Sequence, residues 1–270
     1  SVLDMYVLNN FSPESTMKKI LVPSLIALAV SSLASVAQAQ TAPESTLSYN
    51  VGVVTDYRYR GISQTRLDPA LQGGVDYADK SGFYVGVWGS SIKWIKDAGT
   101  LTDTTGIKGS VEVDLYGGYK GTAGDVAYDV GFLRYEYAGN NLKNTGYANA
   151  NTNEVYGAVT YGLFTAKYSH AISNLFGNVD SKNSYYVDLS AALDLGDGYT
   201  LTPHVGYQKI KNWADGSYTD YALTLGKDLG NGLSASAAVI GTDAKEGSYV
   251  SPAGKQLGKS GVVVGLKYAF

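Results

Sequence analysis

Two histidines, His170 and His204, are the first residues to consider for catalysis in this chain of 270 residues. A lipid-hydrolysing triad needs a serine hydroxyl within hydrogen-bond reach of an imidazole. Ser169 precedes His170, but neighbouring residues of a strand point to opposite faces. No nucleophile can be assigned to His204 from the sequence. We therefore expect no catalytic site.

Metal and cofactor chemistry is also hard to place on this sequence. Acidic residues such as Asp97, Asp103 and Glu246 lack the spacing of a calcium-binding loop, and cysteine is absent. Scattered glycines show no phosphate-loop order. The formal charge of −3 gives no electrostatic case for binding nucleic acid. We expect no metal, no cofactor and no nucleic-acid partner.

The stretch TDYRYRGISQT at residues 55–65 alternates tyrosine with arginine. Tyr57 and Tyr59 fall on one face of a strand, and Arg58 and Arg60 fall on the other. Tyrosine favours a membrane interface and arginine favours water, so the pattern suits a strand between lipid and a watery lumen. We expect Tyr57 and Tyr59 to point outward and to belong to an aromatic girdle.

The N-terminal part resembles an export signal. Met17 begins a segment with two lysines, an apolar stretch from Ile20 to Val30, and the small residues of an A-x-A site at 37–39. The alternative interpretation is an uncleaved membrane anchor, but the apolar stretch is short for one. The expected organisation is therefore an over-called extension at 1–16, a signal peptide at 17–39 and an outer-membrane β-barrel at 40–270.

Alternating apolar and polar residues recur through the rest of the chain, each run followed by turn residues. Short Gly/Asp/Asn turns alternate with long polar connections, as in outer-membrane barrels. The pattern predicts an all-β fold, a closed antiparallel up-and-down transmembrane β-barrel of about 12 strands. The expected strands are 47–60, 70–78, 82–92, 109–120, 126–137, 153–161, 164–173, 184–195, 199–210, 218–227, 233–243 and 260–270.

Two strands fit the pattern imperfectly. Pro203 lies within an apolar series, although proline cannot donate a hydrogen bond to a sheet. In 126–137 the apolar phase changes after Phe132. Either a bulge shifts the register there, or Arg134 and Glu136 lie above the lipid.

The residues on the predicted inner face would line a pore. They are the bases Arg58, Arg60, Lys120, Lys167 and Lys267, the acids Asp56, Asp76, Glu112, Asp114, Asp129, Glu154, Asp188 and Asp220, and His204. Acids exceed bases, which predicts a mild preference for cations. The alternative is mutual neutralisation of these charges inside a packed barrel without a channel.

The last strand carries apolar residues on one face and ends in phenylalanine. Val262, Val264, Leu266, Tyr268 and Phe270 share that face, and Lys267 falls on the other. This ending resembles the C-terminal signal by which outer-membrane barrels are recognised for assembly. We expect contacts with the assembly machinery, with membrane lipid and lipopolysaccharide, and with small solutes; the oligomeric state is left open.

Two N-terminal blocks carry a family resemblance. YNVGVVTDYRYRGISQT and PALQGGVDYADKSGFYVGVWGSSIKW resemble the TorF-type family of proteobacterial outer-membrane proteins, thought to be porins. The resemblance covers the mature chain and implies a barrel in the outer membrane. The expected function is passive diffusion of small hydrophilic solutes or ions, without an enzymatic step. The alternatives are a plugged barrel with a structural or adhesive role, and an outer-membrane hydrolase.

Overall fold

The computed structural model describes residues 45–270, so the predicted extension and signal peptide lie outside the described residues. The described chain forms strands β1 to β15, one α-helix and two 3-10 helices. Their bounds are β1 Thr46–Val54, β2 Arg58–Tyr59, β3 Ile62–Ser63, β4 Ala70–Ala78, β5 Phe83–Ser91, α1 Trp94–Leu101, β6 Val111–Ala123, β7 Val126–Glu136, η1 Leu142–Thr145, β8 Thr152–Tyr161, β9 Phe164–Ala171, β10 Tyr185–Ala191, β11 Leu193–Gly196, β12 Tyr199–Lys209, η2 Ala214–Gly216, β13 Tyr218–Gly230, β14 Leu233–Thr242 and β15 Gly261–Ala269.

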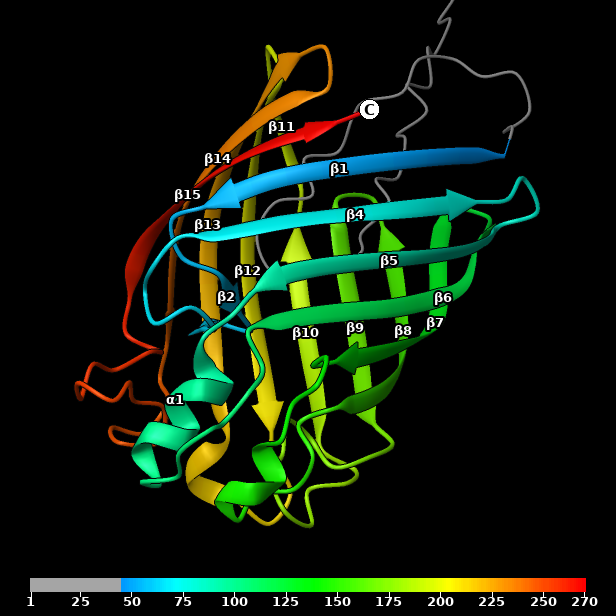
Figure 1. Ribbon diagram of the computed structural model, residues 1–270. Helices are drawn as coiled ribbons and strands as arrows, with labels where there is room; N and C mark the ends of the chain where they lie inside the picture. The colour runs from blue at the N-terminus through cyan, green and yellow to red at the C-terminus, as the bar shows by residue number, and fades with distance from the viewer. Residues whose placement is uncertain (1–44) are drawn as a thin grey trace, which may run out of the picture.

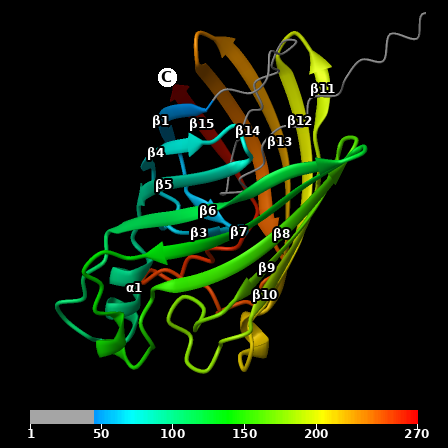
Figure 2. The ribbon, with the colours of Figure 1, turned by 90° about the vertical axis from the view of Figure 1, so that its right-hand side faces the viewer.

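The strands form one closed antiparallel barrel. Each strand of the wall pairs with its neighbour in the chain, and β1 pairs with both β4 and β15 (Figure 1). Strands β6 to β10 lie side by side in Figure 2. The ring closes where β12 pairs with both β10 and β11, which together make one wall strand. The wall therefore has the twelve strands that the sequence predicts.

The division between β10 and β11 explains how the barrel accommodates Pro203. Ser190 pairs with His204 and Leu193 pairs with Leu201, so Pro203 lies opposite the interrupted stretch. Proline has no amide hydrogen to donate across the ladder. The sheet is thus interrupted in the partner strand opposite Pro203, and Pro203 itself stays paired with Leu223 of β13.

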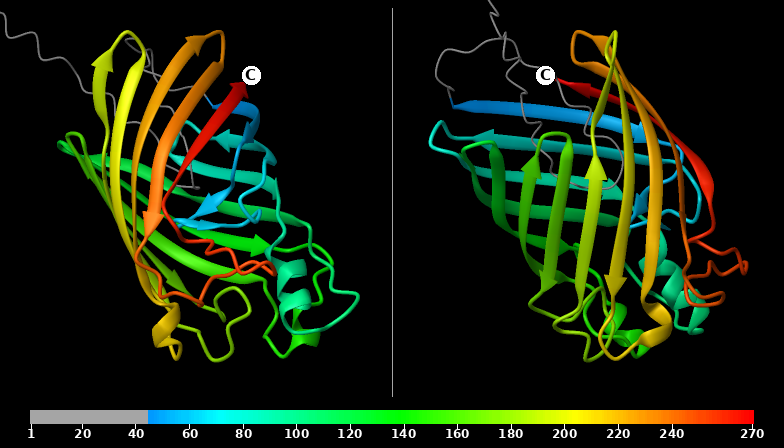
Figure 3. Two further views of the ribbon diagram at one scale, coloured as in Figure 1. Left: turned by 90° about the vertical axis from the view of Figure 1, so that its left-hand side faces the viewer. Right: turned by 180° about the vertical axis from the view of Figure 1, so that it is seen from behind.

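The connections are sorted between the two ends of the barrel, as Figure 3 shows from two sides. One end, the turn end, carries five short turns; the other, the loop end, carries α1, η1 and η2. Asn231 and Gly232 both have positive φ in the turn between β13 and β14. Two such residues form the type of turn that matches the twist of a hairpin. No helix of residues 45–270 is long and apolar enough to span a membrane.

The outer surface of the wall is apolar. Leu47, Val85, Leu189 and Val239 are among many large apolar side chains that point away from the barrel and stay exposed. On β15 the predicted outward set is exposed as well, namely Val262, Val264, Leu266, Tyr268 and Phe270. An exposed apolar belt of this size requires a nonpolar environment, so the wall is built to span a membrane.

The register of β7 resolves the ambiguity at Phe132. Pairing with β6 and β8 is continuous, so no bulge shifts the strand. Leu133 and Tyr135 are buried inside, while Arg134 and Glu136 stay on the outer face. There Arg134 Nη2 lies 2.5 Å from Glu136 Oε2. The structure therefore excludes the bulge and leaves Arg134 and Glu136 on the outer face, and their position above the lipid stays a prediction.

The first strand is shorter than predicted, and the expectation that Tyr57 and Tyr59 point outward is wrong. β1 ends at Val54, and Tyr57 is completely buried inside the barrel. Arg60 and Gly61 both have positive φ, which turns β2 back onto β3 in a two-residue hairpin. The alternation of tyrosine and arginine thus continues into a segment that has left the wall.

Candidate functional site

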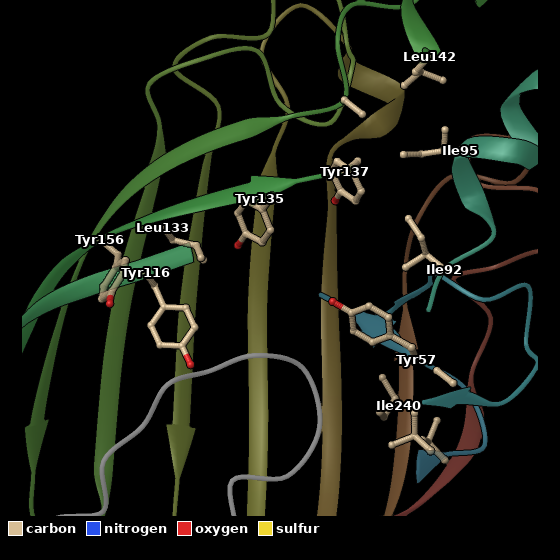
Figure 4. Close-up of a cluster of buried hydrophobic side chains, with 14 of the residues drawn as sticks. Tyr57, Ile92, Ile95, Tyr116, Leu133, Tyr135, Tyr137, Leu142, Tyr156 and Ile240 are labelled. Carbon is tan, nitrogen blue, oxygen red and sulfur yellow. The ribbon is translucent and has the colours of Figure 1, made fainter. Parts of the chain in front are cut away.

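Residues 55–68, here called the plug hairpin, fold from the end of β1 into the loop-end half of the lumen. Tyr57 Oη donates to Glu112 Oε1 on β6 at 2.7 Å, and Tyr59 Oη lies 2.6 Å from Tyr135 Oη on β7. In Figure 4 the rings of Tyr57, Tyr135 and Tyr137 project into the interior. The hairpin therefore reaches across the lumen from the side of β1.

Arg58 anchors the base of the plug hairpin. Its guanidinium forms an ion pair with Asp56 and donates to the carbonyl oxygens of Gly61 and Leu257 at 2.9 and 3.1 Å. Both charged side chains are almost completely buried. A buried guanidinium with this many acceptors is a rigid connection, because its planar fork fixes several directions at once.

Arg60 ties the tip of the hairpin to the far wall. Its Nη2 donates to Glu154 Oε2 of β8 at 2.8 Å, and its Nη1 donates to Gln208 Oε1 of β12 at 2.6 Å. Its guanidinium carbon also lies 4.3 Å from the ring centroid of Tyr186. One side chain thus connects the plug hairpin to three wall strands.

His204 bridges two carboxylates on the inner wall. Its Nδ1 lies 3.0 Å from Asp188 Oδ2 and its Nε2 lies 2.8 Å from Asp220 Oδ1. Tyr186 Oη donates to Asp220 Oδ2 at 2.9 Å. His170 is on the outer face instead, with Nδ1 2.9 Å from Tyr168 Oη. The sequence placed His204 inside correctly, and its neighbours give it a charge-pairing environment.

Two inner carboxylates lack partners for some of their oxygens among the described residues. Asp114 is completely buried and neither of its oxygens has a hydrogen-bond partner. Glu154 Oε1 is unpartnered as well. Burying an unpaired carboxylate oxygen costs free energy, because water no longer solvates it. Among the inner acids, Asp114 and Glu154 are therefore the ones whose oxygens the described protein groups satisfy least.

Charged side chains near the turn end of the lumen differ in burial. Asp76, Lys120 and Lys267 are half-buried there, whereas Asp129, which pairs across the strands with Lys120, is buried. Lys120 Nζ lies 4.6 Å from the ring centroid of Tyr84. No salt bridge holds Lys120 or Lys267 within residues 45–270. These two lysines are therefore partly exposed inner charges without an ion-pair partner among the described residues.

Tyrosines on the inner wall lie against glycines of neighbouring strands. A Cβ added at Gly86 would come within 2.3 Å of the Tyr116 ring, and one at Gly206 within 2.0 Å of Tyr186 Oη. A Cβ added at Gly131 would likewise lie 2.5 Å from the Tyr156 ring. Side chains larger than hydrogen would displace these rings. The abundance of glycine and tyrosine thus has a structural cause in the wall.

A separate cavity opens at the loop end, on the outer side of the plug hairpin. It has a volume of about 390 Å³ and is lined mainly by aromatic and aliphatic side chains. Asp97, a charged residue of the lining, forms an ion pair with Arg66. The hydrogen bond with Asp97 raises the pKa of Arg66. The cavity and the plug hairpin share Tyr59, Ile62 and Gln64.

The structure thus places the predicted inner residues in three groups. Asp56, Arg58 and Arg60 belong to the plug hairpin; Glu112, Asp114, Glu154, Lys167, Asp188, His204 and Asp220 are on the wall around it; Asp76, Lys120, Asp129 and Lys267 lie nearer the turn end. Whether a conducting path passes them stays a prediction. The inner tyrosines are contact residues that we did not predict. Tyr116 shares the parity of Glu112 and Asp114, which is the signal that could have found it.

Comparison with solved structures supports the fold. A KdgM porin aligns with a TM-score of 0.50 at 10% identity, covering 84% of this chain and 99% of the porin. A NanC porin aligns with a TM-score of 0.49 at 9% identity over 83% and 99%. Outer membrane phospholipase A from Escherichia coli aligns with a TM-score of 0.42 at 11% identity over 83% and 88%. At 10% identity the likeness to the KdgM porin shows a shared barrel fold.

Sequence comparison shows the family. No curated protein sequence matches the chain. The TorF-type name indicated by the two N-terminal blocks is not confirmed, because the matching family model carries another description. That model, Gcw_chp, covers residues 38–270, nearly all of the chain. The chain therefore belongs to the Gcw_chp family, described as bacterial proteins of unknown function.

Proposed function

We propose that this barrel is a porin-like channel of the outer membrane through which small hydrophilic solutes or ions diffuse passively, and that the plug hairpin controls the path. The supporting geometry is the uneven burial of the inner charges along the lumen. Asp76, Lys120 and Lys267 near the turn end are half-buried, whereas Glu112, Asp114 and Glu154 beside the plug hairpin are buried. The short turns would face the periplasm and the long loops the outside, as in other barrels of this membrane.

The observation that carries the proposal is the way in which the plug hairpin is attached. It contacts the far wall through polar groups, chiefly Arg60 with Glu154 and Gln208. Unpartnered oxygens of Asp114 and Glu154 lie nearby. Polar contacts can be exchanged for contacts with water, so the attachment of Arg60 to the far wall can loosen when water enters.

Planar-bilayer recording of the refolded protein tests the proposal. We expect discrete current steps with short open times, because the closed arrangement predominates. Complete absence of steps, both in the parent protein and in variants with a weakened plug hairpin, would contradict a channel. That outcome would favour the second candidate, a plugged barrel with a structural or adhesive role, which the dense packing around Tyr57 supports.

Selectivity gives a prediction about the inner charges. Arg58 and Arg60 are paired with Asp56 and Glu154, and His204 is shared by two acids. The net excess of acids therefore persists in the folded barrel, and we expect mild cation preference at low ionic strength. Screening by salt should reduce it, because the Debye length is about 10 Å at 0.1 M and shorter above.

The measurement for this prediction is the reversal potential across a tenfold KCl gradient. The double variant Glu112→Gln with Asp114→Asn should lower the cation preference, since it removes inward negative charge. Glu136→Gln is a matched control, because Glu136 lies on the outer face. Anion preference of the parent, or equal shifts in both variants, would show that Glu112 and Asp114 do not act on the permeating ions.

A further inference from the structure

The cavity at the loop end is assembled from every long connection of the barrel. Tyr59 comes from the plug hairpin, Trp94 from α1, Tyr147 from the segment after η1, Phe176 from the connection after β9, Trp213 from that after β12 and Tyr249 from that after β14. Long loops that meet around one space form a site that depends on the whole fold. About 390 Å³ lies within the range of small-molecule sites.

The aromatic walls of the cavity are held in place by ring-to-ring contacts. Tyr218 and Tyr249 meet edge to face with centroids 5.3 Å apart, and Trp213 lies 5.5 Å from Tyr249. On the plug side, Tyr59 and Phe176 meet edge to face at 5.3 Å. Such contacts fix ring orientation, so the walls are formed before a ligand arrives. Flat apolar walls of this kind favour a ligand that carries a ring.

The polar groups of the lining are neutral or already paired. Asp97 is neutralised by Arg66, as described above. Gln64 Nε2 donates to the carbonyl of Ile62 at 3.0 Å, and Asn178 Nδ2 donates to that of Leu175 at 2.9 Å. A side-chain amide can form up to about four hydrogen bonds, so both retain capacity for a ligand. A charged ligand would find no counter-ion among the lining residues and would lose its hydration.

We propose that this cavity binds an uncharged small molecule with a ring-bearing apolar body and one or two hydrogen-bonding groups. The ring packs between the aromatic walls, and the polar group meets the amides at Gln64 or Asn178. Because Tyr59 and Gln64 belong to the plug hairpin, a bound molecule contacts the segment that fills the lumen. The role of the cavity as the entry site of a permeating solute rests on the proposed channel function.

Three indole compounds that differ in charge provide the probes. Indole-3-ethanol is neutral, indole-3-acetate is an anion and tryptamine is a cation at neutral pH. Binding is measured by titration calorimetry on the full barrel in lipid nanodiscs, with empty nanodiscs as the blank. We expect the neutral compound to bind at least about tenfold more tightly than either ion, because burying an unpaired charge is costly. Equal binding of all three compounds would overturn the proposal.

Variants separate cavity binding from partition into lipid. Ala98 lines the cavity and Val179 is an exposed loop residue outside it. Ala98→Trp fills the space and should abolish binding of indole-3-ethanol, whereas Val179→Trp should leave it unchanged. Leu101→Trp, at an exposed lining position, gives the same test if Ala98→Trp does not fold. Unchanged binding in both filled variants would contradict the site.

Bilayer currents distinguish failure of this proposal from failure of the channel. Currents without selective binding of indole-3-ethanol overturn the cavity assignment and leave the channel in place. Selective binding that Ala98→Trp abolishes, in a barrel that gives no current in any variant, supports the cavity and removes its role in permeation.

Discussion

Replacing Arg60 by glutamine is expected to raise the open probability of the channel on the order of 100-fold. The substitution removes the charge that pairs with Glu154 and leaves a buried carboxylate uncompensated. Removing one partner of a buried ion pair costs about 3–5 kcal/mol, and each 1.4 kcal/mol corresponds to a factor of about ten. The cost applies to the closed arrangement, because an open lumen solvates Glu154. Single-channel recording measures the effect directly.

Two further variants make this test specific. Arg134→Gln removes an arginine from an ion pair on the outer face and should leave the open probability unchanged. The double variant Arg60→Gln with Glu154→Gln removes both charges and should restore most of the closed time, since Glu154 then no longer leaves a buried charge uncompensated. If Arg134→Gln opens the channel as much as Arg60→Gln, general destabilisation of the barrel is the cause and the plug mechanism is wrong.

Arginine at Leu189 is expected to lower the free energy of unfolding by roughly 2–4 kcal/mol, because it places a charge on the lipid-facing side of the wall. Leu189 is 51% exposed and lies near the middle of the strand formed by β10 and β11. Urea titration of the barrel in lipid vesicles measures the change. Arginine at the neighbouring Ser190 points inward and should cost much less, because the lumen supplies water and carboxylates.

Val113 supplies a depth control for the same experiment. Val113 lies close to the loop end of β6 and pairs directly with Glu136. Arginine there should cost only about 0–1 kcal/mol, because the penalty falls toward the interface and Glu136 offers a counter-ion. A larger loss at Ser190 than at Leu189 would mean that the assignment of inner and outer faces is inverted.

The wall of the barrel could be predicted from the sequence because two independent patterns agree on it. Alternation with period two assigns the faces, and the sorting of short and long connections assigns the ends. Both patterns persist at Pro203, where the disturbance is absorbed between β10 and β11. The alternation of residues and the closure of the sheet favour the same strands. Pro203 and the change of apolar phase in β7 therefore do not alter the predicted number of strands.

The plug hairpin could not be predicted because its residues alternate with the same period of two as those of a wall strand. Tyr57 and Tyr59 alternate with Arg58 and Arg60 in either arrangement, and both faces of the hairpin are buried. What separates the two cases is the far partner of each side chain. Glu112 is 55 residues from Tyr57 and Glu154 is 94 residues from Arg60. Such pairs become visible only once the barrel closes.

The bore of this barrel, meaning the free width of its lumen, depends on pairs of residues, because each of these inner tyrosine rings lies against a glycine of a neighbouring strand. Gly86 holds the space that the Tyr116 ring occupies, and Gly206 does so for Tyr186. A larger residue at either glycine pushes a phenol toward the axis and narrows the bore, while loss of the tyrosine leaves a groove in the wall. Relatives that transport bulkier solutes should therefore differ from this chain at both residues of a pair. Paired replacements on neighbouring strands would then indicate the width of the lumen in each relative.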